Sequence, residues 1–248
     1  MGILNATPDS FADGGEHFTY PDAVDHGLKL IAEGADLIDV GGESTRPGAE
    51  RVSAAEEERR VVNVISKLAD AGKPISIDTM RASTARAAVI AGASIINDVS
   101  GGLADPQMLQ TAARLQLPYI AMHWRGASKD MNSKAIYGDV VNDVLAELNE
   151  RIEAALDAGI AKDKLIIDPG IGFAKDAEHN WAIIDSIDRF VDLGYPVLVG
   201  ASRKRFLGGD SPDEREAATI QLTKRLGTTG VWAVRVHSVK PHKEVLSS

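Results

Sequence analysis

The sequence predicts a single (β/α)₈ barrel, an α/β fold in which parallel strands alternate with helices. Two observations predict it. Eight short apolar runs each end in, or lead into, a polar or charged residue, and a stretch of helical spacing separates nearly every run from the next. The 248 residues fit one barrel of ordinary size. Buried parallel strands are apolar along their length. Because all of them run in one direction, the polar groups at their C-terminal ends should gather at the mouth of the barrel.

The elements follow one another as strand and helix along the whole chain. The expected strands are residues 3–5, 37–39, 75–78, 95–98, 119–123, 165–168, 197–200 and 231–237. The expected helices are residues 23–33, 82–91, 106–115, 140–156, 182–193, 213–226 and a short 239–248, with one more that starts at a Ser53–Glu56 capping box and turns Val61, Ile65, Leu68 and Ala69 inward. Strict alternation gives a parallel sheet, and eight strands favour closure; a doubly wound open sheet is the alternative.

The composition restricts the class of protein. The net charge of −9 disfavours nucleic acid as a partner and favours a small-molecule substrate or metal-assisted chemistry. The chain contains no cysteine, which excludes disulfides and thiolate metal sites and fits a reducing compartment. It shows no basic and apolar leader and no apolar run near membrane-spanning length, so we expect a cytoplasmic enzyme.

We expect one domain over residues 1–248, because no linker-like stretch or charge block divides the chain; two small domains would also fit the length. The first strand begins at Met1 with little lead-in and the last helix is short, which suggests trimmed ends.

Two long irregular segments follow the first two strands. Residues 6–20 and 41–52 are rich in Gly, Pro, Asp and Ser and lie where a barrel carries its substrate-covering loops. We therefore predict mobile loops there, on the C-terminal face. A third irregular segment, residues 125–138, is interpreted as a surface loop.

Four strand-end residues can face one volume in a closed barrel: Asp78, Asn97, Asp168 and Lys204. Two carboxylates, an amide and an ammonium suit a flat heterocycle that presents N–H donors beside a carbonyl, because such a ligand would pair with the buried carboxylates. The alternative is structural: Asp78 and Asp168 could cap helices or pair with Arg81 and Lys204.

A second group joins the first and last strands, which are neighbours in a closed barrel. Arg235 and His237 stand on alternate residues and project to one face, opposite Asn5. This set resembles an anion site to which residues 202–204 could add, and an amide oxygen such as that of Asn5 can also ligate Mg²⁺.

The motifs resemble the dihydropteroate synthase family. They are residues 2–11 (GILNATPDSF) with Asp13-Gly14-Gly15, residues 39–48 (DVGGESTRPG), 76–79 (SIDT), 96–99 (INDV), 168–173 (DPGIGF), 202–204 (SRK) and 235–237 (RVH). The resemblance spans nearly the whole chain. It implies a barrel that joins 4-aminobenzoate to a 6-hydroxymethyl-dihydropterin diphosphate and releases pyrophosphate.

The resemblance also implies roles for single residues. Asp78, Asn97, Asp168 and Lys204 would hold the pterin with Met122 and Arg235 on its faces, and Asn5, Arg235 and His237 would hold the diphosphate, Asn5 through Mg²⁺. The loop residues Phe11, Asp13, Thr45, Arg46 and Pro47 would enclose the aminobenzoate, and Phe173 would line its pocket. The full expected set is Asp13, Arg46, Lys204 and Arg235 as catalytic residues and Asn5, Phe11, Asp39, Thr45, Pro47, Asp78, Asn97, Met122, Asp168, Phe173, Lys204, Arg235 and His237 as substrate-binding residues.

Two positions depart from the family pattern. Ser238 stands where the family usually has Asp, and we interpret it as a preserved helix N-cap; Arg205 replaces a common Ser near the aminobenzoate pocket. A pterin-dependent methyltransferase shares the pterin wall but does not need Thr45-Arg46-Pro47. A paralogue that binds pterin without turnover is the other alternative. A homodimer of the family type is also expected.

Overall fold

The computed structural model describes residues 1–7, 20–43, 51–126 and 131–247. Its strands are short and lie where the apolar runs predict them. They are β1 Gly2–Asn5, β2 Ile38–Gly41, β3 Ile75–Asp78, β4 Ile95–Asp98, β5 Tyr119–Met122, β6 Leu165–Asp168, β7 Leu198–Val199 and β8 Ala233–Val234. The last two are shorter than expected, so Gly200, Arg235 and His237 follow strands instead of ending them.

The strands form a closed barrel. β1 to β6 make one parallel sheet in sequence order, and β7 and β8 pair in parallel. Two parallel bridges join the sheets, Ile167 to Val197 and Gly2 to Val236. At the second junction Ile3 N donates to Val236 O and Val236 N donates to Met1 O, both at 2.9 Å. The predicted (β/α)₈ barrel is therefore confirmed, and the open sheet is excluded.

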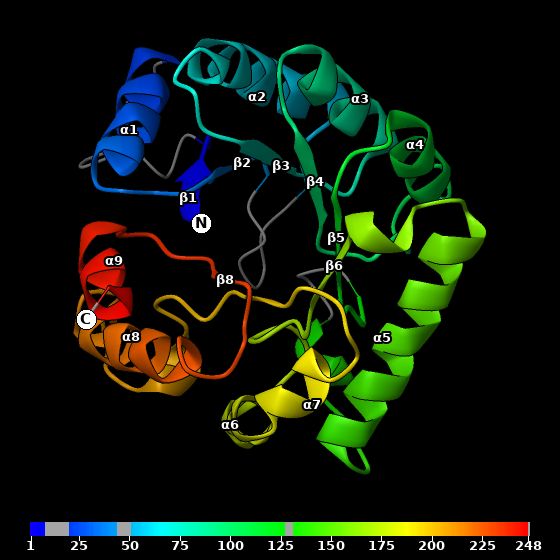
Figure 1. Cartoon of the computed structure of the whole chain (residues 1–248), viewed down its shortest axis with the longest axis vertical. Coiled ribbons are helices and arrows are strands. Elements are labelled where there is room, and N and C mark those ends of the chain that lie inside the picture. Colours follow the sequence, from blue (N-terminus) through cyan, green and yellow to red (C-terminus); the bar gives the residue numbers. More distant parts are fainter. Residues whose placement is uncertain (8–19, 44–50, 127–130, 248) are drawn as a thin grey trace.

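The helices form a ring around the strands (Figure 1). They are α1 Tyr20–Ala32, α2 Ala54–Ala69, α3 Ala82–Ile90, α4 Met108–Leu115, α5 Val140–Asp157, α6 Ala177–Asp185, α7 Ile187–Val191, α8 Glu214–Leu226 and α9 Lys240–Leu246, with 3₁₀ turns at Met131–Lys134, Lys162–Lys164 and Arg205–Leu207. Among these described elements no helix is long and apolar enough to cross a membrane.

Two helix predictions are wrong in detail. The helix expected at 182–193 begins at Ala177 and breaks at Ser186, because a capping box between Asp176 and His179 starts α6 earlier. In α2, Ser53 accepts the Glu56 N–H as predicted, but the Glu56 carboxylate binds Arg59 and Arg60 instead of completing the capping box. Val61, Ile65 and Leu68 are buried as expected, whereas Ala69 is exposed.

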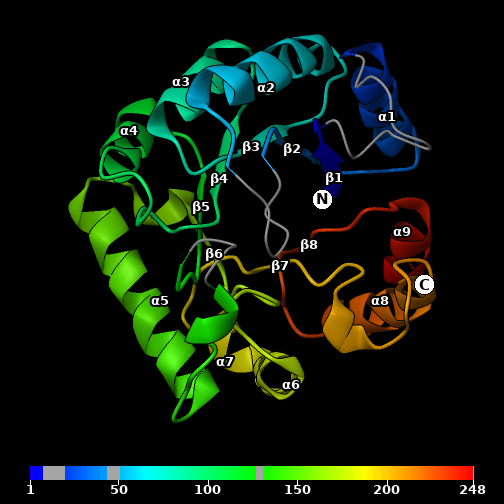
Figure 2. The same ribbon diagram turned by 180° about the vertical axis from the view of Figure 1, so that it is seen from behind.

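The C-terminal helix completes the ring. α9 packs on α8 and reaches α1, as both views show (Figure 2). Lys243 Nζ lies 2.8 Å from Asp36 Oδ1, just before β2, and Val239 Cγ2 lies 3.2 Å from the point where a Cβ on Gly2 would stand. The short last helix therefore covers the junction between the last strand and the first.

Apolar side chains fill two separate layers. The larger core lies between strands and helices and contains residues such as Leu4, Ile38 and Ile77. A smaller core fills the barrel itself and consists of Met1, Leu37, Ile95, Ile120, Ile166 and Leu198, with Ala233 packed against it. Since side chains alternate along a strand, the residue two positions after each of these points into the barrel one layer higher. Among the residues reached in this way, Asp39, Asn97, Asp168 and Arg235 are polar or charged.

Candidate active site

The pairing of the first four strands brings three predicted residues to the same face of the sheet. Asn5 pairs with Gly41, Gly41 with Asp78, and Asp78 with Asn97. Residues in register across a sheet face the same side, so the three polar side chains share the mouth of the barrel. Gly41 leaves room between them: a Cβ there would lie 3.5 Å from Asp78 Oδ2.

The rest of the upper layer follows from the apolar layer below. Met122, Asp168, Gly200 and Arg235 stand two residues after Ile120, Ile166, Leu198 and Ala233. A Cβ on Gly200 would lie 3.8 Å from Arg235 Cβ and 4.0 Å from Asp168 Oδ2. The structure thus brings Asp168 and Arg235 to opposite sides of one small space.

Arg235 links two buried carboxylates. Its Nε lies 2.6 Å from Asp39 Oδ2 and its Nη2 lies 2.8 Å from Asp78 Oδ2. Asp39 also accepts from Asn97 Nδ2 at 3.1 Å and is 0% exposed. Burial opposes the charge on Arg235, but the Asp39 and Asp78 carboxylates outweigh it and raise the pKa of the guanidinium. Asp39 is therefore fully buried beside Arg235 and Asn97 and orients both. Its predicted contact with substrate stays a prediction.

The structural alternative for the two strand-end aspartates is wrong for helix capping and for the pair of Asp78 with Arg81, whereas Asp168 does interact with the Lys204 charge. Asp78 pairs with Arg235, whereas Arg81 pairs with Glu43 and Glu57. The residues that precede α3 and α6 as N-caps are Arg81 and Asp176. Neither Asp78 nor Asp168 caps a helix, and both remain directed at the barrel mouth.

Burial shifts the proton affinity of Asp78. The pKa of this carboxyl rises from 3.8 to about 7, because burial and the nearby Asp39 outweigh the opposing effect of Arg235. Between these two values the folded protein keeps a proton on Asp78 that the unfolded chain releases. The contribution of Asp78 to stability therefore falls as the pH rises through this window.

Asp78→Asn should remove that dependence. We expect the free energy of unfolding of the variant to improve relative to the parent protein as the pH rises from 5 to 7, by at most about 1.4 kcal/mol per pH unit. Urea denaturation of both proteins across this range measures the difference. Parallel stability curves would contradict the shifted pKa of Asp78.

The segment after β6 carries Asp168 and Phe173. Asp168 Oδ1 accepts the N–H of Gly170 at 2.7 Å, and His123 N donates to Asp168 O at 2.9 Å. Lys204 donates to the carbonyl of Ile171, and its Nζ lies 4.6 Å from the centre of the Phe173 ring. The structure therefore places Asp168, Phe173 and Lys204, three predicted site residues, around one turn.

The two charges at this turn respond to burial in opposite ways. Burial raises the pKa of Asp168, while the Gly170 N–H and the Lys204 charge oppose the rise. Burial lowers the pKa of Lys204 to about 8, against the attraction of Asp168. A ligand that offers an N–H to Asp168 and an acceptor to Lys204 would stabilise both charged forms.

Gly170 is required by the shape of this turn. Its φ is +69°, and a Cβ there would lie 2.4 Å from the carbonyl oxygen of His123. Gly194 has a similar φ of +77°, but no described atom lies within 4 Å of a Cβ at that position.

Gly170→Ala should therefore be more destabilising than Gly194→Ala. The left-handed backbone costs each variant about 1–2 kcal/mol, and only Gly170→Ala also displaces the turn that holds Asp168. We expect weaker pterin binding in this variant alone, measured by calorimetry beside urea denaturation. Equal stability and unchanged binding in both variants would contradict the assigned role of Gly170.

His237 lies beside Ser202 instead of beside Arg235. Its Nδ1 is 3.0 Å from Ser202 Oγ, and its backbone N–H donates to the same oxygen at 3.2 Å. The Arg235 guanidinium binds the carboxylates of Asp39 and Asp78. It therefore lies with these acidic residues and not beside His237, its expected partner in an anion site. Asn5 stands half-buried at the end of β1, next to the last strand as predicted.

The interpretation of Ser238 as a helix cap is wrong. Its hydroxyl donates to Glu216 Oε1 of α8, and α9 begins after Val239 with no side-chain cap. Glu216 also binds Arg203 at 2.7 Å and lies 3.2 Å from His242 Nε2. Ser238 is thus linked to the 202–204 turn through Glu216, which binds both Ser238 and Arg203.

Five predicted residues lie outside the described residues. They are Phe11, Asp13, Thr45, Arg46 and Pro47. The anchors on either side of the second loop are described: Arg81 Nη1 lies 2.6 Å from Glu43 Oε2, Arg81 Nη2 donates to Val52 O at 2.5 Å, and Arg51 pairs with Glu43.

The donors present fit Mg²⁺ as a diphosphate-bound ion. Among the described residues no three His, Cys, Asp or Glu side chains gather into a metal cluster. Mg²⁺ usually takes few protein oxygens and completes its shell with phosphate and water. The amide oxygen of Asn5 at the barrel mouth is a suitable protein ligand of that kind.

Comparison with known proteins identifies the family. The model of the pterin binding enzyme family matches residues 1–237. The chain belongs to this family. It is 46% identical to the dihydropteroate synthase of Mycobacterium leprae over 99% of this chain and 90% of the relative.

Solved structures of the family agree with the barrel. The dihydropteroate synthase of Xanthomonas albilineans with 4-aminobenzoic acid superimposes with a TM-score of 0.93 at 45% identity, over 99% of this chain and 89% of that one. The same enzyme in complex with 7,8-dihydropteroate gives a TM-score of 0.89 at 42% identity, over 99% and 90%.

Sequence reasoning missed two sets of partners that support the site. Glu57 of α2 is 1% exposed, accepts a hydrogen bond from Thr79 Oγ1 at 2.5 Å and forms an ion pair with Arg81. Lys175 contacts His123 behind the Asp168 turn. A charged residue among the buried positions of a helix was the available signal for Glu57. Nothing in the spacing pointed to Lys175.

Proposed function

We propose that this chain joins 4-aminobenzoate to 6-hydroxymethyl-7,8-dihydropterin diphosphate and releases pyrophosphate, the dihydropteroate synthase reaction of folate biosynthesis. It is a transferase. The observation that carries the proposal is the mouth of the barrel, where Asp78, Asn97, Asp168 and Arg235 lie together. Relatives that share nearly half of its residues carry the same name, and solved relatives hold 4-aminobenzoic acid and 7,8-dihydropteroate.

The pterin half of the site pairs each polar edge with a complementary group. Asp168 and Asp78 accept N–H groups of the ring, Asn97 can donate or accept, and Lys204 donates to a ring oxygen or nitrogen. Met122, which is 3% exposed, and Arg235 are assigned to the ring faces. Buried charges gain most from such partners, because an unpaired carboxylate in this layer is costly.

The reaction exchanges one bond for another at the exocyclic methylene. The carbon–oxygen bond to the diphosphate breaks, and the bridging oxygen leaves with the electron pair. The amine nitrogen of 4-aminobenzoate forms the new bond and then loses a proton. Arg235 and His237 stabilise the charge that develops on the leaving group. Mg²⁺ held in part by Asn5 supplies further positive charge to the diphosphate when bound.

The remaining roles concern the aminobenzoate. Phe11, Asp13, Thr45, Arg46 and Pro47 are assigned to the two loops that enclose it, with Asp13 placed to stabilise the cation-like methylene. Phe173, beside Lys204, lines the same pocket. Since an aromatic amine is already a nucleophile, positioning contributes more than a strong base would.

The proposal includes the setting of the enzyme. Residues 1–248 form one barrel domain that works as a homodimer in the cytoplasm on small-molecule substrates, with no nucleic acid or membrane partner. The acidic composition disfavours a nucleic-acid partner, and the absence of cysteine fits a reducing compartment such as the cytoplasm. Sedimentation measures the dimer directly.

An assay of pyrophosphate release tests the function. With Mg²⁺, pterin diphosphate and 4-aminobenzoate, we expect release that requires all three and stops on chelation of the metal. A folded protein that binds pterin in calorimetry but releases no pyrophosphate would support the paralogue instead. Absence of pterin binding would contradict both.

A further inference from the structure

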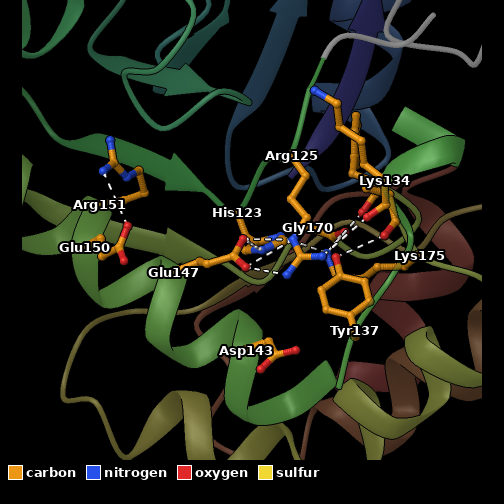
Figure 3. A network of polar contacts seen from close by, with 12 residues as sticks. His123, Arg125, Lys134, Tyr137, Asp143, Glu147, Glu150, Arg151, Gly170 and Lys175 are labelled. Carbon is orange, nitrogen blue, oxygen red and sulfur yellow. Dashed lines mark hydrogen bonds and ion pairs between the residues drawn. The ribbon is translucent and has the colours of Figure 1, made fainter. Parts of the chain in front are cut away.

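A buried polar cluster lies behind the Asp168 turn, on the side away from the barrel mouth. It joins His123 at the end of β5, Glu147 of α5 and Lys175 before α6 (Figure 3). His123 is 1% exposed and Lys175 is 8% exposed, so both have left water. Buried charged groups of this kind are retained only when they are paired.

The three contacts of Lys175 fix the position of its protons. Its Nζ lies 3.0 Å from Gly170 O, 3.1 Å from Phe173 O and 2.9 Å from His123 Nδ1. Carbonyl oxygens can only accept, so the amine donates to both. A full ammonium has one more hydrogen for His123 Nδ1, which leaves the imidazole proton on Nε2.

The N–H on Nε2 then donates a hydrogen bond to Glu147. His123 Nε2 lies 3.0 Å from Glu147 Oε2, and Arg125 binds both oxygens of the same carboxylate. Burial and the nearby Lys175 lower the pKa of His123 to about 4, and burial lowers the pKa of Lys175 to about 7. Between these two pH values the positive charge therefore resides on Lys175, and a neutral His123 connects it to Glu147.

The acceptors of Lys175 belong to the turn that presents the pterin-facing residues. The Gly170 N–H holds Asp168 Oδ1 at 2.7 Å, and the Gly170 carbonyl receives Lys175 on the other side of the same residue. Lys175 also donates to the Phe173 carbonyl. The carbonyl of the next residue, Ala174, accepts a hydrogen bond from the Tyr137 hydroxyl at 3.0 Å. One ammonium thus fixes both ends of the turn from Gly170 to Phe173.

Charge adds a second link to Asp168. Lys204, Arg235 and Lys175 all favour the ionised carboxylate against the effect of burial. Lys204 and Arg235 approach from the strands that follow, and Lys175 approaches from behind the turn, with His123, Glu147 and Arg125 around it. Loss of the Lys175 charge would therefore raise the pKa of Asp168 although no side chain at the barrel mouth is replaced.

We propose that Lys175 is a positioning residue for pterin binding, which fixes the turn from Gly170 to Phe173 from behind and is itself oriented by His123 and Glu147. This inference depends on the proposed function, because it assigns Asp168 to the pterin. Lys175 does not touch the substrate; it acts through Asp168 and Phe173.

Calorimetric titration with 6-hydroxymethylpterin diphosphate between pH 5 and pH 7, where Lys175 carries its charge, tests the inference. The parent protein, Lys175→Met and the matched control Lys162→Met, an exposed lysine before β6, are compared. We expect Lys175→Met to bind the pterin about 10-fold more weakly or worse, with a smaller rise in the KM for 4-aminobenzoate, because Lys175 also holds Phe173, which is assigned to that pocket. The pH at which acid abolishes binding should also rise, because Asp168 has lost a nearby cation.

The outcomes separate the inference from the proposed function. Absence of pterin binding in the parent protein would overturn the proposed function itself. Parent-like affinity and an unmoved acid limit in folded Lys175→Met would overturn only the role of Lys175. Should Lys175→Met not fold, Glu147→Gln is measured in its place: weaker pterin binding than in the parent supports the inference, and unchanged binding overturns it.

Discussion

Replacing Arg235 with alanine should reduce turnover by about 100-fold or more and lower the free energy of unfolding by about 3–5 kcal/mol. The guanidinium is the partner of two buried carboxylates, Asp39 and Asp78, at 2.6 and 2.8 Å. Its removal leaves two buried carboxyl groups without their cationic partner and withdraws the cation assigned to the leaving group. Pyrophosphate-release kinetics and urea denaturation measure the two effects.

Two further variants give the Arg235 result its meaning. Arg235→Lys keeps the charge but cannot span both carboxylates in the planar geometry of a guanidinium, so partial stability with poor turnover is expected. Arg225→Ala removes an arginine of α8 whose pair with Asp185 is exposed, and it should cost less than about 1 kcal/mol. If Arg235→Ala matched Arg225→Ala in both measurements, the assigned position of Arg235 would be wrong.

Asp168→Asn should weaken pterin binding by about 10- to 100-fold, since hydrogen bonds to a charged group contribute about 1.5–3 kcal/mol. The amide oxygen of asparagine can still accept the Gly170 N–H, which Asp168 Oδ1 accepts at 2.7 Å. The turn therefore keeps its shape while the negative charge is lost. We expect a larger change in pterin affinity than in kcat at saturation.

The matched control for this prediction is Asp163→Asn, an exposed aspartate just before β6. It should leave pterin affinity unchanged. Calorimetry with the pterin diphosphate gives the affinity of both variants. Equal affinity in Asp168→Asn and Asp163→Asn would remove Asp168 from the pterin site.

Much of this architecture was predictable from local pattern. Each apolar run gave a strand, and period-two alternation explains why Asp168 rises above Ile166 and Arg235 above Ala233. The same pattern predicted that strand ends converge. Because parallel strands share one direction, their C-terminal residues had to meet once the barrel closed.

What the pattern could not predict depends on contacts between distant elements. The pairing of Arg235 with Asp39 and of Ser238 with Glu216 joins residues far apart in the chain, and spacing carries no information on such pairs. The early start of α6 was missed because a His at the third helical position completed its capping box. Lys175 was missed because its ammonium is buried in part by His123, a residue distant in the sequence, and the local pattern around Lys175 gives no sign of that contact.

A crystal structure with the pterin and pyrophosphate bound tests the convergence of the strand ends most directly. We expect the bicyclic ring to contact Asp168 and the pyrophosphate to lie toward Asn5 and His237, with Arg235 within reach of both. A pterin bound elsewhere, with Asp168 and Arg235 contacting no common ligand pair, would contradict the proposed site.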